Sequence, residues 1–333
     1  MPDQSVWLFM VTIALAIGFT MVNGATDAAN AIATVIGSKA LSPRNAIIMA
    51  SLLNFVGSAT GLEVARTIGK GIVNPEIITY GVIIAALATN IIWSMTALHY
   101  GLPTSETHGL VASLAGGALA TAGSQAVNWS VILRIIMWVI ITPLLSFITG
   151  YVVMVAIYWL FQHSQPDRVR RIFNNLQIAS AGYMAYSHGL NDGHMPVGII
   201  TMALVLHTGQ VNLWDNIPLW VILTSAIAIS TGTALGGWRI IRTLGAKVTA
   251  LRPVHGFAAE TSGALVIQIA SLFGMPVSTT QGISAAIMGV GATKRLSAVR
   301  WGVARAIFAA WVLTFPICGV LGYLLARLLH LVF

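Results

Sequence analysis

Two aspartates stand in apolar sequence at corresponding places in the two halves of the chain. Asp27 lies in "VNGATDAANAIATVIGSK" and Asp192 lies in "HGLNDGHMPVGIIT", 165 positions further on. A carboxylate at membrane depth is costly, so it persists where it is paired or lines an aqueous path. Neutral side-chain oxygens, which suit a small hard cation, accompany both aspartates: Asn23, Thr26, Asn30 and Asn191. The pattern predicts a cation or proton site; the structural alternative is a buried Asp held by helix-end amides or by an arginine.

Two hydroxyl-rich motifs, "PTSETH" (103–108) and "PVSTTQ" (276–281), also correspond between the halves. Proline at a helix start followed by Ser and Thr is typical of a capped N-terminus with unpaired backbone N–H groups. Such a terminus binds anions, and two of them facing each other would surround a tetrahedral oxyanion. The candidate anion ligands are Thr104, Ser105, Thr107, Ser278, Thr279, Thr280 and Gln281. The alternative is ordinary N-capping of two re-entrant helices.

Three other groups of polar residues are candidates for a role at the site. Glu106 has no counterpart in the second motif, and we expect it to be a coupling group that carries a proton, or an ion-pair partner of Arg66 or Arg242. Glu260 is expected in the first turn of a helix, where an acid complements the helix dipole. His188 and His194 lie six residues apart, which is poor spacing for one helical face. With His108 they predict no metal cluster.

Three pairs of motifs in the same order indicate that the chain is a duplicated unit. Besides the two aspartates, "GLEVARTIG" matches "GWRIIRTLG" at an offset of 176, and the two hydroxyl motifs match at an offset of 173. Duplicated halves with interrupted helices at matching positions point to a secondary transporter. We expect a first repeat over residues 1–162, a basic cytoplasmic linker over 163–171 and a second repeat over 172–333.

The composition requires a membrane protein with several spans. Of the 333 residues, 57% are hydrophobic and 8% are charged, which leaves far too little polar surface for a soluble domain. Long apolar runs predict an all-α polytopic fold, broken near Pro143, with two shorter stretches (104–122 and 277–292) as re-entrant hairpins or broken helices. The expected spans are 6–22, 44–62, 77–97, 128–162, 174–188, 197–207, 217–236, 257–273 and 299–332. The net charge of +8 comes from basic residues at helix ends, which indicates positive-inside topology rather than a nucleic-acid partner.

At these motifs the chain resembles the inorganic phosphate transporter (PiT) family. "GATDAANAIATVIGSKALSPRNAIIMASLLNFVGS" and "SHGLNDGHMPVGIITMALV" are similar to the two family signatures, and the two hydroxyl motifs are similar to its hairpin segments. The resemblance implies two inverted repeats, each with a broken helix and a re-entrant hairpin, and a homodimer. It places the anion at the midplane on the hydroxyl motifs, and Asp27, Asn30, Asn191 and Asp192 at the coupling ions and the anion.

Four residues depart from the family pattern. Thr26 stands where the first signature usually has Asn, and Met195 replaces a Lys. Glu106 replaces a small hydroxyl residue, and Gln281 replaces a His. Relatives that carry sulfate also depart from the hydroxyl and His pattern, so the departures leave sulfate as an alternative cargo. Phosphate can donate a hydrogen bond to a carboxylate such as Glu106 and sulfate cannot, and this argument favours phosphate.

The resulting expectation is a symporter of inorganic phosphate in the lipid bilayer of a bacterial or archaeal plasma (inner) membrane. It works by alternating access, is coupled to H⁺ or Na⁺, and needs no cofactor and no resident metal. A sulfate permease of the same fold is the alternative, and a metal–phosphate complex is another possible cargo. A lipid-phosphate phosphatase with Glu106 and His108 as acid and base, or an anion channel, are more remote alternatives.

Overall fold

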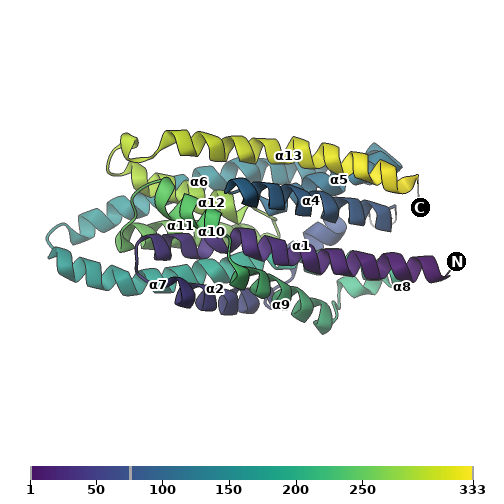
Figure 1. Ribbon diagram of the computed structural model, residues 1–333, viewed down its shortest axis with the longest axis horizontal. Coiled ribbons are helices and arrows are strands. Elements are labelled where there is room, and N and C mark those ends of the chain that lie inside the picture. The colour runs from purple at the N-terminus through teal and green to yellow at the C-terminus, as the bar shows by residue number, and fades with distance from the viewer. Residues whose placement is uncertain (1, 75–76, 332–333) are drawn as a thin grey trace.

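The computed structural model describes residues 2–74 and 77–331 and shows an elongated bundle of helices (Figure 1). Residues 1, 332 and 333, which are the outer limits of the predicted repeats and of the last span, lie outside the described residues. The α-helices are α1 (Pro2–Gly37), α2 (Pro43–Ser58), α3 (Glu63–Arg66), α4 (Tyr80–Tyr100), α5 (Glu106–Ala122), α6 (Trp129–Phe161), α7 (Pro166–Asp192), α8 (His194–Thr208), α9 (Leu219–Leu235), α10 (Trp238–Arg242), α11 (Pro253–Leu272), α12 (Thr279–Ala292) and α13 (Trp301–His330). Short π and 3-10 segments join them: η1 (Thr67–Gly71), η2 (Ser124–Ala126), η3 (Val211–Trp214), η4 (Thr243–Lys247) and η5 (Leu296–Ala298).

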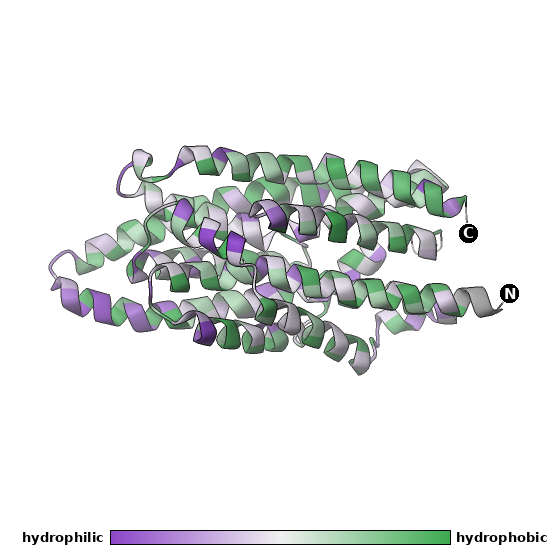
Figure 2. Ribbon diagram, viewed as in Figure 1, coloured by the Kyte–Doolittle hydropathy of each residue, from purple (hydrophilic) through white to green (hydrophobic). Residues whose placement is uncertain are grey.

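The described helices are long and apolar enough for a membrane protein. Four of them (α1 from Val6 onward, α4, α6 and α13) meet the length and hydropathy of a span. The number rises to six if α2 with α3 and η1, and α9 with α10 and η4, each form one span, bent by 65° and 60°. Apolar residues dominate these long helices, whereas the start of α7 at the tip of the bundle is hydrophilic (Figure 2). Large apolar side chains such as Trp159 and Val312, both 72% exposed, lie on the outer surface of these helices.

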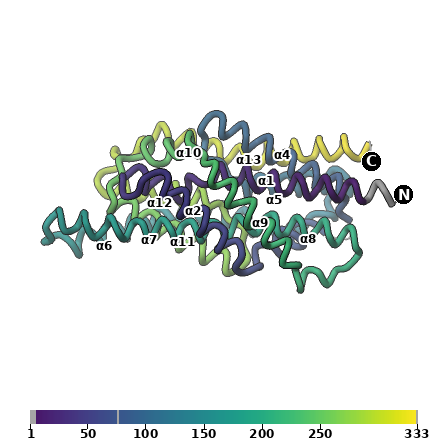
Figure 3. The backbone as a smooth tube through the Cα atoms, turned by 60° about the horizontal axis from the view of Figure 1, so that its bottom comes forward, coloured from purple at the N-terminus to yellow at the C-terminus, as the bar shows by residue number. Residues whose placement is uncertain are grey.

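The ends of α1, α6, α7 and α13 lie at the two opposite ends of the bundle. The chain termini lie at one end of the bundle and the α6–α7 turn lies at the other (Figures 1 and 3). Helix α1 therefore starts at the end opposite to the start of α7, and α6 ends at the end opposite to α13. The packing also corresponds: α1 packs on α9 as α7 packs on α2, and α5 packs on α13 as α12 packs on α6.

The two aspartates sit in different backbone settings. Asp27 lies inside α1, an uninterrupted helix of 36 residues. The prediction of a broken helix is therefore wrong at this stretch. The Ala-rich sequence around Asp27 favours a continuous helix. Asp192 instead ends α7, and Gly193 separates it from α8. Pro196 explains this break, because its ring lacks an N–H and clashes with the carbonyl group four residues earlier, which is that of Asp192.

Helix α6 and the hydroxyl motifs give two further outcomes. The break predicted near Pro143 is wrong, because α6 continues from Trp129 to Phe161 through this residue. The segments 104–122 and 277–292 do form short helices, α5 and α12, each after a sharp turn. The turns contain Gly101 and Gly274, both at φ +67°, a left-handed conformation that favours glycine. Helix α12 is buried along its whole length.

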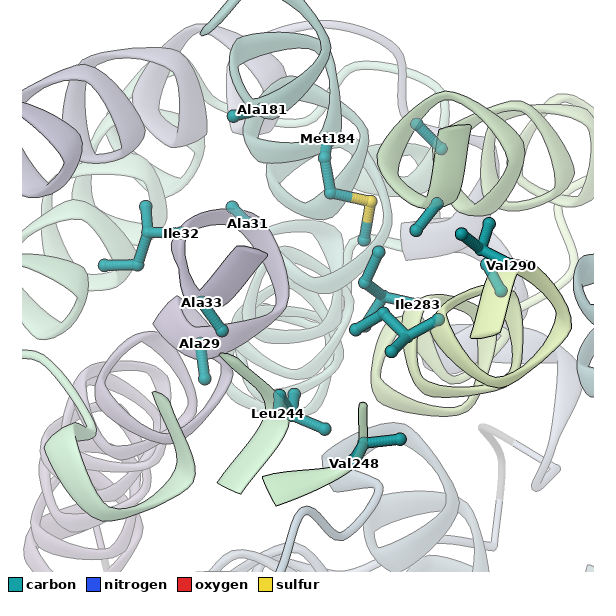
Figure 4. Close-up of a cluster of buried hydrophobic side chains, with 14 of the residues drawn as sticks. Ala29, Ala31, Ile32, Ala33, Ala181, Met184, Leu244, Val248, Ile283 and Val290 are labelled. Carbon is teal, nitrogen blue, oxygen red and sulfur yellow. The ribbon is translucent and has the colours of Figure 1, made fainter. Parts of the chain in front are cut away.

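The core is filled with small side chains, so the helices pack closely. Around α1 the larger cluster contains Ala29, Ala31 and Ala33, of which Ala29 and Ala33 lie on the side of the helix nearer Leu244 (Figure 4). In the same cluster Met184 of α7 points toward Ile283 of α12 (Figure 4). The cluster therefore packs α1, α7 and α12 against one another.

Glycines allow two pairs of helices to touch at their backbones. A Cβ on Gly24 of α1 would lie 2.2 Å from the carbonyl oxygen of Ile229 in α9, and one on Gly232 would lie 2.1 Å from that of Met21. Gly57 and Gly189 make the same contact between α2 and α7, where a Cβ would approach a carbonyl oxygen to 2.2 and 2.3 Å. Any side chain at these four positions must force the helices apart.

We predict that Gly24→Ala destabilises the protein, although Ala is the better helix former by about 0.5–1 kcal/mol. The added methyl group clashes with the α9 backbone, at an expected cost of about 1–3 kcal/mol. The measurement is thermal unfolding of purified protein in detergent. Gly18→Ala is the matched control on the same helix, because a Cβ there meets nothing within 4 Å. Equal melting temperatures for the two variants would contradict the close α1–α9 contact.

Candidate functional site

The starts of α5 and α12 meet in the middle of the bundle, each capped by a serine. Ser105 Oγ accepts from the backbone N–H of His108 at 3.2 Å, and Ser278 Oγ accepts from that of Gln281 at 3.2 Å. Thr107 of α5 donates to the carbonyl oxygen of Val277 at 3.2 Å, which joins the two motifs directly. The positive ends of two helix dipoles therefore lie close together in a buried position. Both serines have the capping role that was the structural alternative for these motifs.

The first residues of α12 also bring Asp27 and Asp192 together. Thr280 Oγ1 donates to Asp27 at 3.1 Å. Thr279 Oγ1 lies 3.3 Å from an oxygen of Asp192 and 3.5 Å from one of Asp27. One hydroxyl carries one proton and so donates fully to only one of these carboxylates. The two aspartates, 165 positions apart in sequence, thus compete for a single donor in a buried site.

Two asparagines complete the polar contacts around this helix start. Asn30 donates from Nδ2 to Thr280 Oγ1 at 2.9 Å and to Thr279 Oγ1 at 3.1 Å. Asn191 donates to Asp192 and to the carbonyl oxygen of Val277, both at 2.7 Å. Both asparagines thereby hold the α12 motif against the helices that carry the aspartates.

His188 is a member of this site that the sequence reasoning missed. It lies one turn before Asp192 on α7, and its Nε2 is 3.3 Å from Asp192 Oδ2. Its Nδ1 is 2.8 Å from Oδ1 of Asn54, whose Nδ2 donates to Thr233. Because Asn54 Oδ1 is an acceptor, Nδ1 of His188 carries the proton. In a neutral imidazole Nε2 is then an acceptor that faces another acceptor, so a proton or a cation is needed between the two atoms.

Asp27, His188 and Asp192 each place one possible ligand atom within 4.8 Å of the other two. The expectation that the histidines take no part in a cation cluster compared the wrong pair, because His188 and Asp192 are at i and i+4, on one helical face. The i, i+4 spacing of His188 and Asp192 is visible in "HGLND". The tautomer of His188, however, depends on Asn54, 134 residues away. His108 and His194 do not belong to this group.

Glu106 is the first residue of α5, as Thr279 is the first residue of α12, but the two side chains make different contacts. Its carboxylate accepts from Thr26 Oγ1 at 3.2 Å and from Ser94 of α4. The pairing with Arg66 or Arg242 is wrong: Arg66 forms an exposed ion pair with Glu63 at 2.9 Å, and Arg242 is exposed. Two departures from the family pattern, Thr26 and Glu106, are thus in direct contact.

The remaining candidate residues are buried but contribute fewer contacts. Asn23 is fully buried, and within the described chain neither polar atom of its side chain has a hydrogen-bond partner. The same holds for Gln281 Oε1. Thr104 is 3% exposed, in the turn before Ser105. The site therefore contains polar atoms that are available to a ligand.

Glu260 lies elsewhere and differs from expectation. It is the eighth residue of α11, beyond the first turn, and it is fully buried. Its carboxylate accepts from Thr34 of α1 and from Ser180 of α7. Hydroxyl donors, rather than a helix dipole, therefore satisfy this buried carboxyl group.

The bundle and its buried polar centre define a membrane protein of the transporter class. The sequence model of the Phosphate transporter family matches residues 23–322. A Bacillus subtilis (strain 168) protein named "Probable low-affinity inorganic phosphate transporter" is 40% identical over 331 residues, 98% of either chain. A Rhizobium meliloti (strain 1021) protein of the same name is 40% identical over 318 residues, 95% of either chain.

The fold comparison agrees with the sequence comparison. A solved structure described as "The sodium-dependent phosphate transporter" has a TM-score of 0.86 and 26% identity, and the match covers 98% of this chain and 100% of that chain. The chain belongs to the phosphate transporter family. These relatives are transporters and not enzymes, which confirms that expectation and gives the lipid-phosphate phosphatase alternative no support.

We predict that Asp27→Asn stabilises the protein in sodium-free buffer at neutral pH by about 0.5–2 kcal/mol. The change keeps the shape of the side chain and removes one of two close negative charges. The measurement is the melting temperature in detergent. Asp167→Asn is the control, since Asp167 is exposed and forms an exposed ion pair with Arg170 at 3.3 Å. A lower melting temperature than that of the control would contradict charge repulsion at the site.

Proposed function

We propose that this chain is a cation-coupled symporter of inorganic phosphate that works by alternating access. The observation that carries the proposal is the meeting of two capped helix starts and two buried aspartates at the first turn of α12. Positive helix ends suit an anion and paired carboxylates suit a cation, so one site has both requirements of a symporter. Membership of the phosphate transporter family and the phosphate transporters among its relatives support phosphate as the anion.

The anion binds, in this proposal, between the starts of α5 and α12. Thr107, Thr279 and Thr280 offer hydroxyl groups there, and the unpaired backbone N–H groups of the two helices add donors. Ser105 and Ser278 fix the helix starts by capping. Thr104, Asn191 and Gln281 complete the proposed set of anion-binding residues.

The coupling cation binds next to the anion, between Asp27 and Asp192. His188 joins these residues, because its Nε2 needs a proton or a cation where it faces Asp192. Asn23, Thr26 and Asn30 provide neutral oxygens nearby on α1. The cation is sodium or a proton; the sodium dependence in the name of the structural relative supports sodium, and the imidazole–carboxylate contact supports a proton.

Alternating access is supported by burial and by the correspondence of the two halves. Asp27, Asp192 and the hydroxyl motifs are at most 4% exposed, so a ligand reaches them only if the bundle opens. We infer two inverted repeats, residues 1–162 and 172–333, joined by the basic linker 163–171. The opposite courses of α1 and α7, and the matched glycine contacts of Gly24 and Gly189, support this inference. Each repeat then opens the site to one side of the membrane.

We predict that protein in liposomes accumulates labelled phosphate under an imposed sodium or proton gradient, and that Asp192→Asn or His188→Ala lowers this uptake at least a hundredfold. The reason is the loss of the group that holds the coupling cation. Sodium and pH are varied independently, so the active gradient identifies the cation. Asp215→Asn, at an exposed position after η3, is the matched control. Gradient-driven uptake at the control level in both site variants would remove these residues from coupling.

We predict that Glu106→Gln weakens the preference for phosphate over sulfate by about tenfold to a hundredfold, the value of a hydrogen bond to a charged group. The Glu106 carboxylate has lone pairs that accept from a protonated phosphate, whereas the amide of Gln donates equally well to sulfate. The measurement is competition of unlabelled sulfate against labelled phosphate uptake. Glu63→Gln, which removes an exposed carboxylate, is the control. Unchanged discrimination would contradict a selectivity role of Glu106.

A further inference from the structure

A cavity of about 570 Å³ lies away from the aspartates, where the end of α6, the start of α7, the start of α11 and the connection after α12 meet. The α6–α7 turn forms the tip of the bundle opposite the chain termini (Figure 3). Its lining combines basic side chains with apolar and aromatic ones. The proposed transport mechanism uses none of these residues.

The charge of this cavity is positive and poorly balanced. Arg170, Arg252 and Lys294 line it, and the acid that lines it, Asp167, forms a 3.3 Å ion pair with Arg170. Lys294 lies in the connection after α12, outside the membrane-spanning helices. Burial lowers the pKa of Lys294 below its usual value, and the neighbouring Arg252 guanidinium lowers it further. Two cations that disfavour each other at one cavity are stabilised by an anion.

Neutral donors also face the cavity. The backbone N–H of Arg252 donates to His255 Nδ1 at 3.0 Å, so the imidazole proton is on Nε2. That Nε2 lies 3.3 Å from the hydroxyl oxygen of Tyr158, which accepts there and keeps its own O–H for another acceptor. Helices α7 and α11 both begin at the cavity, with Pro166 and Pro253 among its lining residues, so two helix N-termini add to the positive field.

Most of the other lining residues are apolar and continue onto the apolar outer surface of α6. Ile157 and Phe161 of α6 line the cavity together with Val254 of α11. On the same turns of α6, Trp159 and Leu160 are 72% and 70% exposed. An anionic group in this cavity would thus have hydrocarbon surface beside it, which a water-soluble anion does not need.

This end of the bundle is also the basic end. The α6–α7 turn lies there, and Arg168, Arg170 and Arg171 follow it in the first turns of α7. Lys294 and Arg295 follow α12 on the side of the same cavity. The positive-inside rule places such connections in the cytoplasm, where the membrane leaflet carries anionic lipids.

We propose that this cavity binds the headgroup phosphate of an anionic phospholipid. Arg252, Lys294 and the Tyr158 hydroxyl contact the phosphodiester, and the acyl chains lie along the outer face of α6. The site is separate from the transport site and does not depend on the transport proposal. Because it joins the α6–α7 connection between the halves to α11, a lipid bound there stabilises the fold from the cytoplasmic leaflet.

The test is lipid binding to purified full-length protein, measured by native mass spectrometry with phosphatidylglycerol and with phosphatidylcholine of the same acyl chains. Wild-type protein is expected to retain phosphatidylglycerol preferentially. The double variant Arg252→Gln/Lys294→Gln should bind it roughly thirtyfold more weakly, from about 1 kcal/mol for each basic residue near an anionic lipid. Tyr158→Phe, which removes only the hydroxyl group, should weaken binding about fivefold.

The matched control is Arg168→Gln/Arg171→Gln, which removes two charges from the same end of the molecule at residues that do not line the cavity. Its phosphatidylglycerol binding should stay within about twofold of wild type. Equal loss in both double variants, or equal retention of the two lipids, would overturn the proposal. Displacement of phosphatidylglycerol by an equal concentration of inorganic phosphate would also overturn it and assign the cavity to free phosphate. Tyr158→Phe keeps the test decisive if the charge variant does not fold.

Discussion

The contact of Thr279 and Thr280 with Asp27 and Asp192 is the interaction on which the arrangement of this protein depends. Two carboxylates buried in an apolar bundle are expensive, and described ion pairs join neither of them to a lysine or arginine. The start of α12 offsets this cost with hydroxyl donors and with the positive end of its dipole. For this contact to form, α12 must begin at the same depth in the bundle as Asp27 of α1 and Asp192 of α7. The capped start after Pro276 meets that condition.

Close backbone packing sets that depth. Gly24 and Gly189 each stand three residues before an aspartate, about one helical turn, and each touches the carbonyl oxygen of a neighbouring helix. Because neither contact tolerates a Cβ, α1 and α7 are fixed along their partners α9 and α2. The aspartates are then placed by backbone contacts that do not depend on their own charge. Under the proposed symport, such a frame holds the two aspartates in place independently of the ligands they bind.

The sequence predicted the parts of this structure that occur twice. Asp27 with Asp192, and Ser105 with Ser278, were found because each copy supports the other, and the structure brings Asp27, Asp192 and Ser278 to the start of α12. Two features that occur once were not predicted. The role of His188 depends on Asn54, a distant residue in α2, and the position of Glu260 depends on where α11 begins. The helix break after Asp192 was predictable from Pro196, whereas its absence after Asp27 follows from the Ala-rich sequence.

The two halves of the site differ at the residue that precedes each aspartate. Asn191, next to Asp192, holds the second hydroxyl motif through the carbonyl oxygen of Val277. Thr26, at the same place beside Asp27, is too short for that contact and instead donates to Glu106, which Ser94 also contacts. Residues 26 and 106 therefore depart from the family pattern as a contacting pair: the Thr26 hydroxyl lies 3.2 Å from the Glu106 carboxyl group and also 3.0 Å from the carbonyl oxygens of Val22 and Asn23. In one half of the site the amide of Asn191 holds the hydroxyl motif, whereas in the other half the carboxyl group of Glu106 is an acceptor at the start of α5. Under the proposed function, in which the anion binds between the starts of α5 and α12, that acceptor favours a ligand that still carries a proton, as phosphate does and sulfate does not.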